Sequence, residues 1–279
     1  MSGRLSVVAT PIGNLDDVTL RALATLREAD AILAEDTRRT RVLCTHHGVS
    51  TPLRAFHAHS PDEKVDALAR ELAEGAHFAL VTDAGTPLVS DPGARLVSAA
   101  ASLGVKIEPI PGPSAPLAAL SASGLRVGAF RFDGFLPRSG GRRKRALGAA
   151  RDAAEATVLF EAANRLAKTL RELAEVVGAD RPAAVCRELT KLHEEIARGT
   201  LGELAERFAE GARGEVTLVI EGRPDDAAPE PVDREAAIEQ ARALLDEGLR
   251  TKAAARKLAE ALGLTAGDAY AIVLEARGS

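Results

Sequence analysis

Short apolar runs that alternate with helical patterns constrain the fold of the first 110 residues more than any other feature. Four runs have the length of buried strands: residues 5–9, 31–34, 78–81 and 105–110. Between them, apolar residues recur at helical spacing, as in Val65, Leu68, Ala69 and Leu72. Such alternation predicts an α/β fold with a largely parallel sheet that helices cover on both faces.

Local capping patterns suggest where the helices begin. Asp16 and Asp17 precede a helical pattern that carries Val18, Ala22 and Leu26 on one face. The segment SPDE at 60–63 predicts a capping box with Pro61 at the first helical position. A further helix is expected over about 93–103, between the third and fourth strands.

The densest Pro and Gly punctuation, at 109–113, predicts a junction between two domains. A second α/β region follows, with strands expected at 157–160, 183–187 and 216–221 and helices at 164–177 and 201–208. The second of these helices lies behind a capping box formed by Thr200 and Glu203.

An acidic, Pro-containing linker separates this region from three short helical patterns, at 233–247, 251–262 and 265–276. The last two resemble a helix–turn–helix with Gly263 at the turn, although a small helical cap explains them equally well. We therefore expect an N-terminal domain at 1–112, a second at 113–223, a linker at 224–232 and a small helical domain at 233–279.

Composition sets broad limits on function. Hydrophobic residues make up 46% and charged residues 27%, a globular balance, and the net charge of −4 neither supports nor excludes a nucleic-acid substrate. No apolar run approaches the ~20 residues that span a bilayer and the N-terminus lacks a signal-peptide pattern, so we expect a cytoplasmic protein. The two cysteines have no partner at ligand spacing, which disfavours a metal site or a disulfide. A surface role is the simplest interpretation of four histidines: His46, His47, His57 and His59.

Unusual residues cluster where the predicted strands end, the edge at which open α/β sheets bind ligands. The loops 9–15, 82–93 and 111–115 are rich in Gly, Pro, Thr and Asp, and such loops leave backbone groups free for a ligand. They could also be ordinary loops, and 111–115 a simple hinge. The chain has no Gly-x-Gly-x-x-Gly fingerprint and no Walker P-loop, which argues against a Rossmann-type methyltransferase, a dehydrogenase and a P-loop nucleotidase.

Three charged segments accompany these loops. Residues 35–39 are either functional or a solvated helix start that Asp36 or Thr37 caps. Residues 187–195 are either functional or a charged helix with pairs such as Lys191–Glu195. Five cations occur within 138–145, a density that suits phosphate contacts but also occurs on solvated surfaces.

Together these motifs resemble one family, the small-subunit ribosomal RNA methyltransferases I of the tetrapyrrole-methylase superfamily. Seven segments carry the resemblance in the same order: VATPIGNL with its continuation to 22, EDTR at 35–38, DAGTPLVSDPG at 83–93, PGPSA at 111–115, GFLPR at 134–138, RELTK at 187–191 and VIEG at 219–222. The likeness covers residues 5–222 and is weaker in the helical tail.

The resemblance implies two α/β domains with S-adenosylmethionine (SAM) in the cleft between them, a homodimer, and 2′-O-methylation of a cytidine in the decoding region of 16S rRNA. It also implies thirteen residues that hold SAM: Pro11, Ile12, Asp83, Gly85, Thr86, Val89, Ser90, Ser114, Ala115, Phe160, Leu189, Val216 and Thr217. The chain departs from the family's common Glu-Ala-Pro-His-Arg at 161–165, where it reads EAANR, so a role carried by that histidine is not available here. It also has Thr82 where the family commonly has Ser, which keeps the hydroxyl.

Methyl transfer to a ribose hydroxyl needs a base or a cation for the developing oxyanion. We expect Glu188 and Lys191 to supply this polar environment, with Glu161 and Arg165 as further catalytic candidates. The candidates for RNA contact are Asp36, Arg38, Arg138, Arg142, Arg143, Lys144, Arg145 and Arg187.

Two rival interpretations remain open at the level of sequence. A methyltransferase of the same fold could act on a tetrapyrrole or another small molecule, although the basic segment favours RNA. A non-catalytic RNA-binding assembly factor would explain the basic segment and the helical tail, but it would have no use for a cofactor loop at 82–93.

Overall fold

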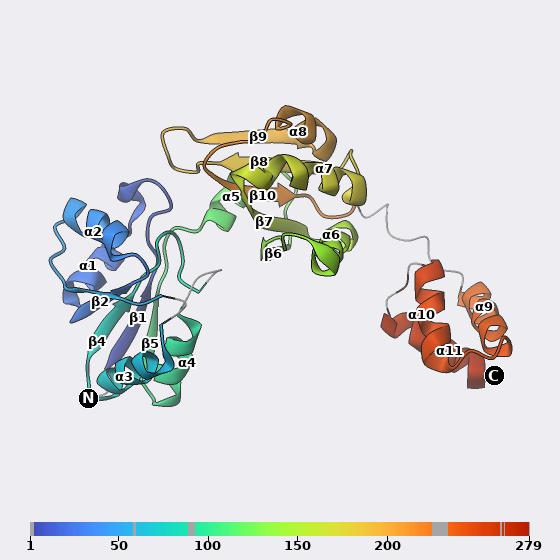
Figure 1. Cartoon of the computed structure of the whole chain (residues 1–279), viewed down its shortest axis with the longest axis horizontal. Helices are drawn as coiled ribbons and strands as arrows, with labels where there is room; N and C mark the ends of the chain where they lie inside the picture. Colours follow the sequence, from blue (N-terminus) through green and yellow to red (C-terminus); the bar gives the residue numbers. More distant parts are fainter. Residues whose placement is uncertain are drawn as a thin grey trace. The chain divides into compact units, whose positions relative to one another are not determined.

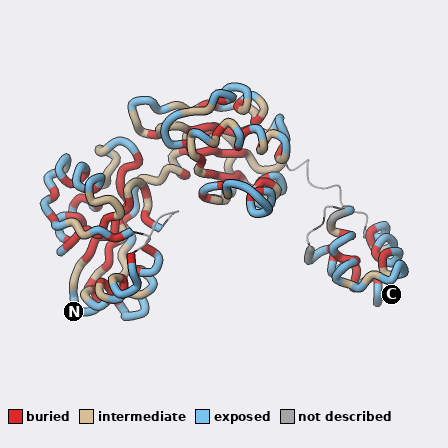
Figure 2. The backbone as a smooth tube through the Cα atoms, in the orientation of Figure 1, coloured by how far each residue is buried: buried red, intermediate tan, exposed pale blue. Residues whose placement is uncertain are grey.

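A computed structural model describes residues 3–57, 60–88, 93–224, 234–262, 264 and 266–278. The chain forms two compact units, Met1–Gly222 and Arg223–Ser279. The first contains two five-stranded sheets, each with its own helices, and we call these the first and second lobes (Figure 1). Within each lobe the central strands are buried and the outer helix faces are exposed (Figure 2).

The first lobe is built on a fully parallel sheet of order β3-β2-β4-β1-β5. Its strands are β1 (Arg4–Val8), β2 (Ala31–Ala34), β3 (Leu53–Ala55), β4 (His77–Leu80) and β5 (Lys106–Ile110). Its helices are α1 (Leu20–Glu28), α2 (Thr37–His46), α3 (Asp62–Ala73) and α4 (Ala94–Ser102). One apolar cluster packs α3 and α4 against one face, and another packs α1 and α2 against the other. The predicted strands and the two-sided covering are therefore confirmed.

Two predicted helix starts in this lobe are wrong. Residues Leu15–Asp17 form a short 3-10 turn, η1, and α1 begins only at Leu20, where the Thr19 hydroxyl accepts a hydrogen bond from the Ala22 N–H. Helix α3 begins at Asp62 without a capping box, because Ser60 Oγ accepts from the His57 N–H instead. At the first place Thr19 rather than an aspartate caps the helix, and Asp16 contacts His46 of α2; at the second place a contact within the loop uses the serine that the sequence pattern offers as a cap.

The second lobe has a mixed sheet of order β6-β7-β10-β8-β9. Its strands are β6 (Phe130–Phe135), β7 (Ala156–Ala162), β8 (Pro182–Arg187), β9 (Glu195–Thr200) and β10 (Glu215–Ile220). Only β6 and β7 are parallel, so the strand directions of this lobe differ from those of the first, although the predicted second α/β region is present. The physical reason is the connection from β8 to β9, residues 188–194, which is too short for the crossover that parallel strands need.

Helices cover both faces of the second sheet. Helix α5 (Ala115–Ser123) packs on one face, and α6 (Gly140–Asp152), α7 (Leu166–Val177) and α8 (Leu201–Arg207) pack on the other. A 3-10 turn, η2 (Ala163–Arg165), precedes α7, and the predicted capping box of Thr200 and Glu203 is present at α8. Residues 187–195 are not a helix: Lys191 pairs with Glu188 and Glu215, while Glu195 lies in β9.

The C-terminal unit contains α9 (Arg234–Asp246), α10 (Thr251–Leu262) and α11 (Ala266–Gly278) around an apolar core of its own, which includes Ala241, Leu258 and Val273. The expected turn residue Gly263 and the linker residues 225–232 lie outside the described residues. The domain boundaries given above stay a prediction. Within the described segments, no helix is long and apolar enough to span a membrane.

Candidate active site

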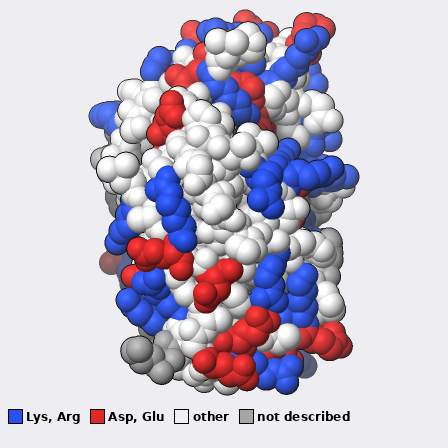
Figure 3. Space-filling view, turned by 90° about the vertical axis from the view of Figure 1, so that its left-hand side faces the viewer, with Lys and Arg blue, Asp and Glu red and all other residues white. Residues whose placement is uncertain are grey.

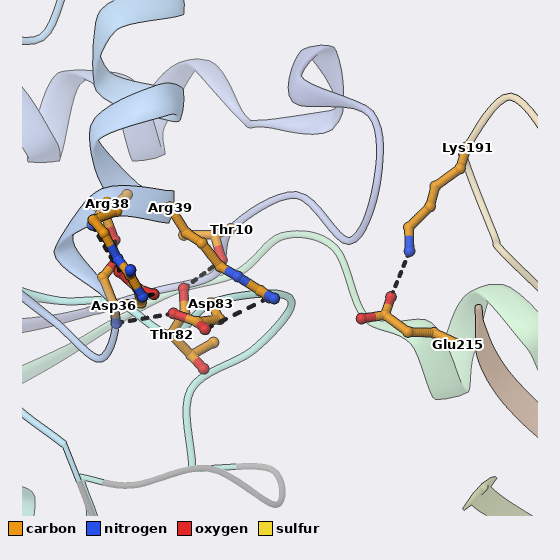
Figure 4. Close-up of polar contacts among 9 residues, drawn as sticks. Thr10, Asp36, Arg38, Arg39, Thr82, Asp83, Lys191 and Glu215 are labelled. Carbon is orange, nitrogen blue, oxygen red and sulfur yellow. Dashed lines mark hydrogen bonds and ion pairs between the residues drawn. The ribbon is translucent and has the colours of Figure 1, made fainter. Parts of the chain in front are cut away.

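Three loops meet beyond the carboxyl ends of β1, β4 and β5. Thr10 and Gly85 exchange two backbone hydrogen bonds, 2.9 and 3.0 Å, and Thr10 Oγ1 donates to the Thr82 carbonyl at 3.1 Å (Figure 4). The Thr86 hydroxyl donates to the Pro113 carbonyl at 3.2 Å. Gly85 has φ +81°, a conformation that glycine adopts without steric cost. These contacts fix the loops to one another at the edge where α/β sheets bind ligands.

Asp83 connects this loop to the end of β2. Its carboxylate accepts the Asp36 N–H at 3.0 Å and lies 3.6 Å from the Arg39 guanidinium (Figure 4). Asp36 caps α2 and pairs with Arg38, and the hydrogen bonds from the Arg38 side chain and backbone hold the pKa of Asp36 well below its usual range. Arg39, rather than Arg38, therefore faces the loop after β4.

A pocket of about 420 Å³ lies between these loops and the second lobe. Its lining residues come from both lobes: Ile12, Arg39, Asp83, Ala84, Gly85, Thr86, Ser114, Ala115, Pro116, Phe135, Phe160, Glu161, Ala162, Cys186, Leu189, Gly214, Glu215, Val216 and Thr217. The loop after β1 reaches furthest across, because Ile12 packs with Leu189 and Cys186, and Asn14 N–H donates to Thr190 Oγ1 at 3.0 Å.

A cation lies beside the pocket on the second lobe. Lys191 Nζ is 2.7 Å from a Glu215 carboxylate oxygen (Figure 4) and 2.9 Å from a Glu188 oxygen. Burial on its own lowers the pKa of Lys191, but the hydrogen bonds and charges of Glu215 and Glu188 outweigh burial and raise that pKa above its ordinary value. The hydrogen bonds from Lys191 and the Glu215 N–H lower the pKa of Glu188. Lys191 is therefore a cation and Glu188 an anion at neutral pH.

Glu161 is buried in the pocket wall, and its carboxylate accepts hydrogen bonds from three donors. Its carboxylate accepts from Arg165 Nε at 2.7 Å, from the Thr169 hydroxyl at 2.6 Å and from the Ala162 N–H at 2.8 Å. The side chain has no exposed surface, so the arginine holds a charge that would otherwise be very costly to bury.

Sequence comparison decides the family. The chain matches the tetrapyrrole (corrin/porphyrin) methylases over residues 4–205. Over 231 residues it is 48% identical to a ribosomal RNA small subunit methyltransferase I of Mesorhizobium japonicum, covering 82% of this chain and 78% of that protein. It is 39% identical to the protein of the same name from Escherichia coli O157:H7, over 99% of this chain and 96% of the other. The chain belongs to the ribosomal RNA small subunit methyltransferase I family.

Solved structures of other tetrapyrrole methylases share the fold at lower identity. A Thermus thermophilus uroporphyrin-III C-methyltransferase in complex with S-adenosylhomocysteine superposes with a TM-score of 0.57 at 21% identity, over 78% of this chain and 97% of that one. A diphthine synthase gives a TM-score of 0.60 at 19% identity, over 78% and 90% of the two chains. At these identities the likeness establishes the two-lobed α/β fold of the family.

Ten of the thirteen residues expected to hold SAM line the pocket. Pro11 does not line it, and Val89 and Ser90 lie outside the described residues. Eight further lining residues were not expected from the sequence: Arg39, Ala84, Pro116, Phe135, Ala162, Cys186, Gly214 and Glu215. Arg39 and Phe135 stand inside or directly beside motifs of this methyltransferase family, so closer attention to those motifs could have found them. Cys186 likewise directly precedes the motif RELTK, whereas Glu215 lies in none of the seven motifs.

The structure gives several residues predicted to bind RNA other partners. Arg143 is buried and bonds to Glu172, Thr169 and the Pro137 carbonyl, so it is occupied within the protein. The Arg187 guanidinium bonds to Glu195 and to the Arg213 carbonyl. By contrast, the other four cations at the start of α6 are not buried: Arg138, Arg142, Lys144 and Arg145.

The histidines are not all simple surface residues. His46 Nε2 lies 3.2 Å from the Asp16 carboxylate, and His47 Nε2 lies 2.9 Å from the Leu15 carbonyl. These three side chains, Asp16, His46 and His47, bring potential metal ligands within 4.8 Å of one another at η1, outside the pocket lining. They attach the end of α2 to the loop after β1.

Both cysteines should resist alkylation while the protein is folded. Burial raises the pKa of the Cys186 thiol to about 11 and also raises that of Cys44, and only the thiolate is reactive. We expect iodoacetamide at pH 8 to label neither thiol in the native protein and both after unfolding in urea, measured by intact mass. Rapid labelling of Cys186 in the native protein would contradict its burial.

Acid should destabilise the enzyme through its paired glutamates. The hydrogen bonds from Arg187 and Arg54 lower the pKa of Glu195 and of Glu71, respectively. Their contribution to stability is therefore present at neutral pH and is lost as the pH falls below about 4.3, the ordinary Glu value, through the folded-state pKa. We expect the melting temperature of Glu195→Gln to depend less steeply on pH below 4.5 than that of the wild type. A Glu175→Gln control, changed at an exposed site, should keep the wild-type slope.

Proposed function

We propose that this chain transfers a methyl group from SAM to the ribose 2′-hydroxyl of a cytidine in the decoding region of 16S rRNA. Membership of the family makes it a methyltransferase of small-subunit rRNA. The observation that carries the proposal is the pocket that the loops after β1, β4 and β5 and the second lobe line together. We further propose that it acts in the cytoplasm, where ribosomal subunits assemble, and as a homodimer.

The pocket's residues fit SAM in shape and in charge. Ile12, Phe160 and Leu189 offer apolar walls, and the hydroxyl groups of Thr86, Ser114 and Thr217 offer polar contacts. The lining also includes three carboxylates, Asp83, Glu161 and Glu215, which pair with the cations Arg39, Arg165 and Lys191, respectively. The carboxylates of Asp83 and Glu215 keep exposed surface, so they can lie against the positively charged sulfonium of the ligand. When bound, SAM supplies an activated methyl group.

The protein itself must align the acceptor hydroxyl and stabilise its developing charge. Lys191 is kept protonated and lies beside the pocket, so we assign it to stabilising the negative charge that develops on the acceptor oxygen. Lys191 cannot be the base at neutral pH. Glu188 holds Lys191 in place, and Glu161 with Arg165 shapes the wall, so we propose positioning roles for these three.

The decisive experiment is transfer of radiolabelled methyl from SAM to small ribosomal subunits isolated from a strain that lacks this gene. We expect label at one alkali-resistant ribose, because 2′-O-methylation blocks attack of that oxygen on the neighbouring phosphate. Lys191→Ala should lower kcat at least tenfold while S-adenosylhomocysteine binds as in the wild type. A Lys252→Ala change in α10 is the control.

Each rival interpretation predicts a different result in this assay. Binding of S-adenosylhomocysteine without label in subunits or free rRNA would indicate a small-molecule acceptor. Binding of RNA without any binding of S-adenosylhomocysteine would indicate a non-catalytic assembly factor.

A further inference from the structure

A second hollow, of about 760 Å³, lies in the second lobe where β6 leads into α6 and η2 leads into α7. Its lining includes four cations, Arg138, Arg143, Arg165 and Lys168, and among the described residues that line it none is acidic. Helices α6 and α7 lie side by side on one face of the second sheet (Figure 1), so these cations converge from two elements. The face of the molecule in Figure 3, by contrast, intersperses positive and negative side chains.

Two of these guanidinium groups are fixed by the fold. Arg165 Nε donates to buried Glu161 at 2.7 Å and its Nη2 donates to the Leu136 carbonyl at 2.8 Å, while within the described part of the chain Nη1 has no hydrogen-bond partner. Arg143 uses all three guanidinium nitrogens, in hydrogen bonds to Glu172, the Pro137 carbonyl and the Thr169 hydroxyl, so among the described residues Arg165 is the one of the two with a free Nη1. An arginine held on one edge by a carboxylate can present its other edge to an oxyanion without losing side-chain entropy.

The charges around the hollow do not cancel. Among the described residues, two carboxylates contact these cations: Glu161 pairs with Arg165, and Glu172 bonds to Arg143 and lies 3.8 Å from Lys168. Four cations against two carboxylates leave two positive charges, carried outward by the side chains of Arg138 and Lys168, which are not buried. Phosphodiester groups of a nucleic-acid strand are the biological anions that suit such a site, since every nucleotide carries one.

The hollow adjoins the candidate SAM pocket. Phe135 and Ala162 line both cavities, so the two share a wall. Phe135 is 56% exposed and packs against Phe160 with ring centroids 5.5 Å apart. An exposed aromatic ring at such a boundary provides a face on which an unstacked base can lie, as proteins that recognise single-stranded RNA use it.

We propose that this hollow binds backbone phosphates of the acceptor RNA strand next to the target nucleotide, through Arg138, Arg165 and Lys168, with Phe135 supporting the base. The proposal rests on the proposed function, because it takes the acceptor to be RNA. The hollow then has a positioning role, because phosphates anchored here place the adjoining ribose at the shared wall, facing the methyl group. Positioning of this kind contributes to the rate by alignment.

The test is a double variant, Arg138→Ala/Lys168→Ala, which leaves Arg143, Arg165 and the hydrogen bonds of both to Glu172 and Glu161 in place. Its control is Arg171→Ala, which removes an exposed cation from the same helix α7 outside the hollow. Three properties are measured for each protein: the affinity for S-adenosylhomocysteine, the salt dependence of binding to a 16S rRNA decoding-region fragment, and KM and kcat with unmodified small subunits.

We expect the double variant to bind S-adenosylhomocysteine within twofold of the wild type. Its KM for subunits should rise at least tenfold, and its plot of log affinity against log salt should be shallower by roughly two units, one for each phosphate that loses its cation. Lys168→Arg should keep most of the RNA affinity that Lys168→Ala loses, because arginine retains the positive charge.

The outcomes separate this proposal from the proposed function. A double variant that matches Arg171→Ala in KM and in salt slope, while the wild type methylates the RNA, overturns the phosphate site alone. A wild type that binds the fragment with the expected slope but never methylates RNA contradicts the proposed function, and the slope then still decides the phosphate site. A wild type that binds no RNA overturns both.

Discussion

Replacing Gly85 by valine is expected to weaken binding of S-adenosylhomocysteine at least a hundredfold. Gly85 has φ +81°, a region that costs a β-branched residue more than the ~1–2 kcal/mol it costs other side chains. Its two backbone hydrogen bonds to Thr10 prevent the loop from moving aside, and a Cβ atom would lie 3.4 Å from Ile12 Cγ2, inside the lining of the pocket. Isothermal calorimetry measures the affinity directly.

The matched control for that experiment is Gly48→Val. Gly48 also has positive φ, +62°, but nothing lies within 4 Å of the position its Cβ would take, and it is remote from the pocket lining. The two variants carry comparable backbone strain, so a loss of affinity confined to Gly85→Val isolates the pocket. Equal affinities in both variants would show that the loop after β4 does not contact the cofactor.

Glu161→Ala is expected to destabilise the protein by about 3–5 kcal/mol, the usual result of removing one partner from a buried ion pair. The substitution leaves the Arg165 guanidinium and the Thr169 hydroxyl without their acceptor in the wall of the pocket. For a unit of this size the loss corresponds to a drop in melting temperature of roughly 6–20 °C. Differential scanning calorimetry provides the measurement.

Glu175→Ala provides the comparison, because that residue is exposed on α7, the helix to which Thr169 belongs, and should change stability by no more than about 0.5 kcal/mol. A melting temperature for Glu161→Ala indistinguishable from that of the control would mean that Arg165 finds another acceptor. The buried network would then not be what fixes the pocket wall.

Apart from β5, an edge strand in which only Ile110 is buried, the strands that sequence reasoning found are the buried ones. The expected run at 31–34 coincides with β2, all four of whose residues are buried. The missed strands β3, β6 and β9 all lie at sheet edges, where one face or side meets solvent. An edge strand such as β6, with sequence FRFDGF, has no reason to form a continuous apolar run, so periodicity does not reveal it.

The candidate site also has a part that the sequence predicts and a part that it does not. The loops after β1, β4 and β5 could be predicted, because ligand loops of an open parallel sheet gather at one edge. The pairing of Lys191 with Glu215 could not be predicted, since the two residues are 24 positions apart and meet only through the β8–β10 register of the mixed sheet. Sequence spacing instead suggested Glu195, which belongs to another strand and binds Arg187 and Arg207.

The loop after β1 ties the melting of the two lobes together. Ile12 is part of the apolar cluster of the second lobe, and Gly13 has no room for a Cβ atom because Lys191 Cγ, Leu189 O and Thr190 Oγ1 lie within 2.8 Å of that position. A ligand in the pocket touches this loop and residues of both lobes at once, and it stabilises every part of the protein that must be folded to bind it. Saturating ligand should therefore merge the unfolding of both lobes into one cooperative transition. A destabilising substitution in either lobe should then lower the melting temperature of both.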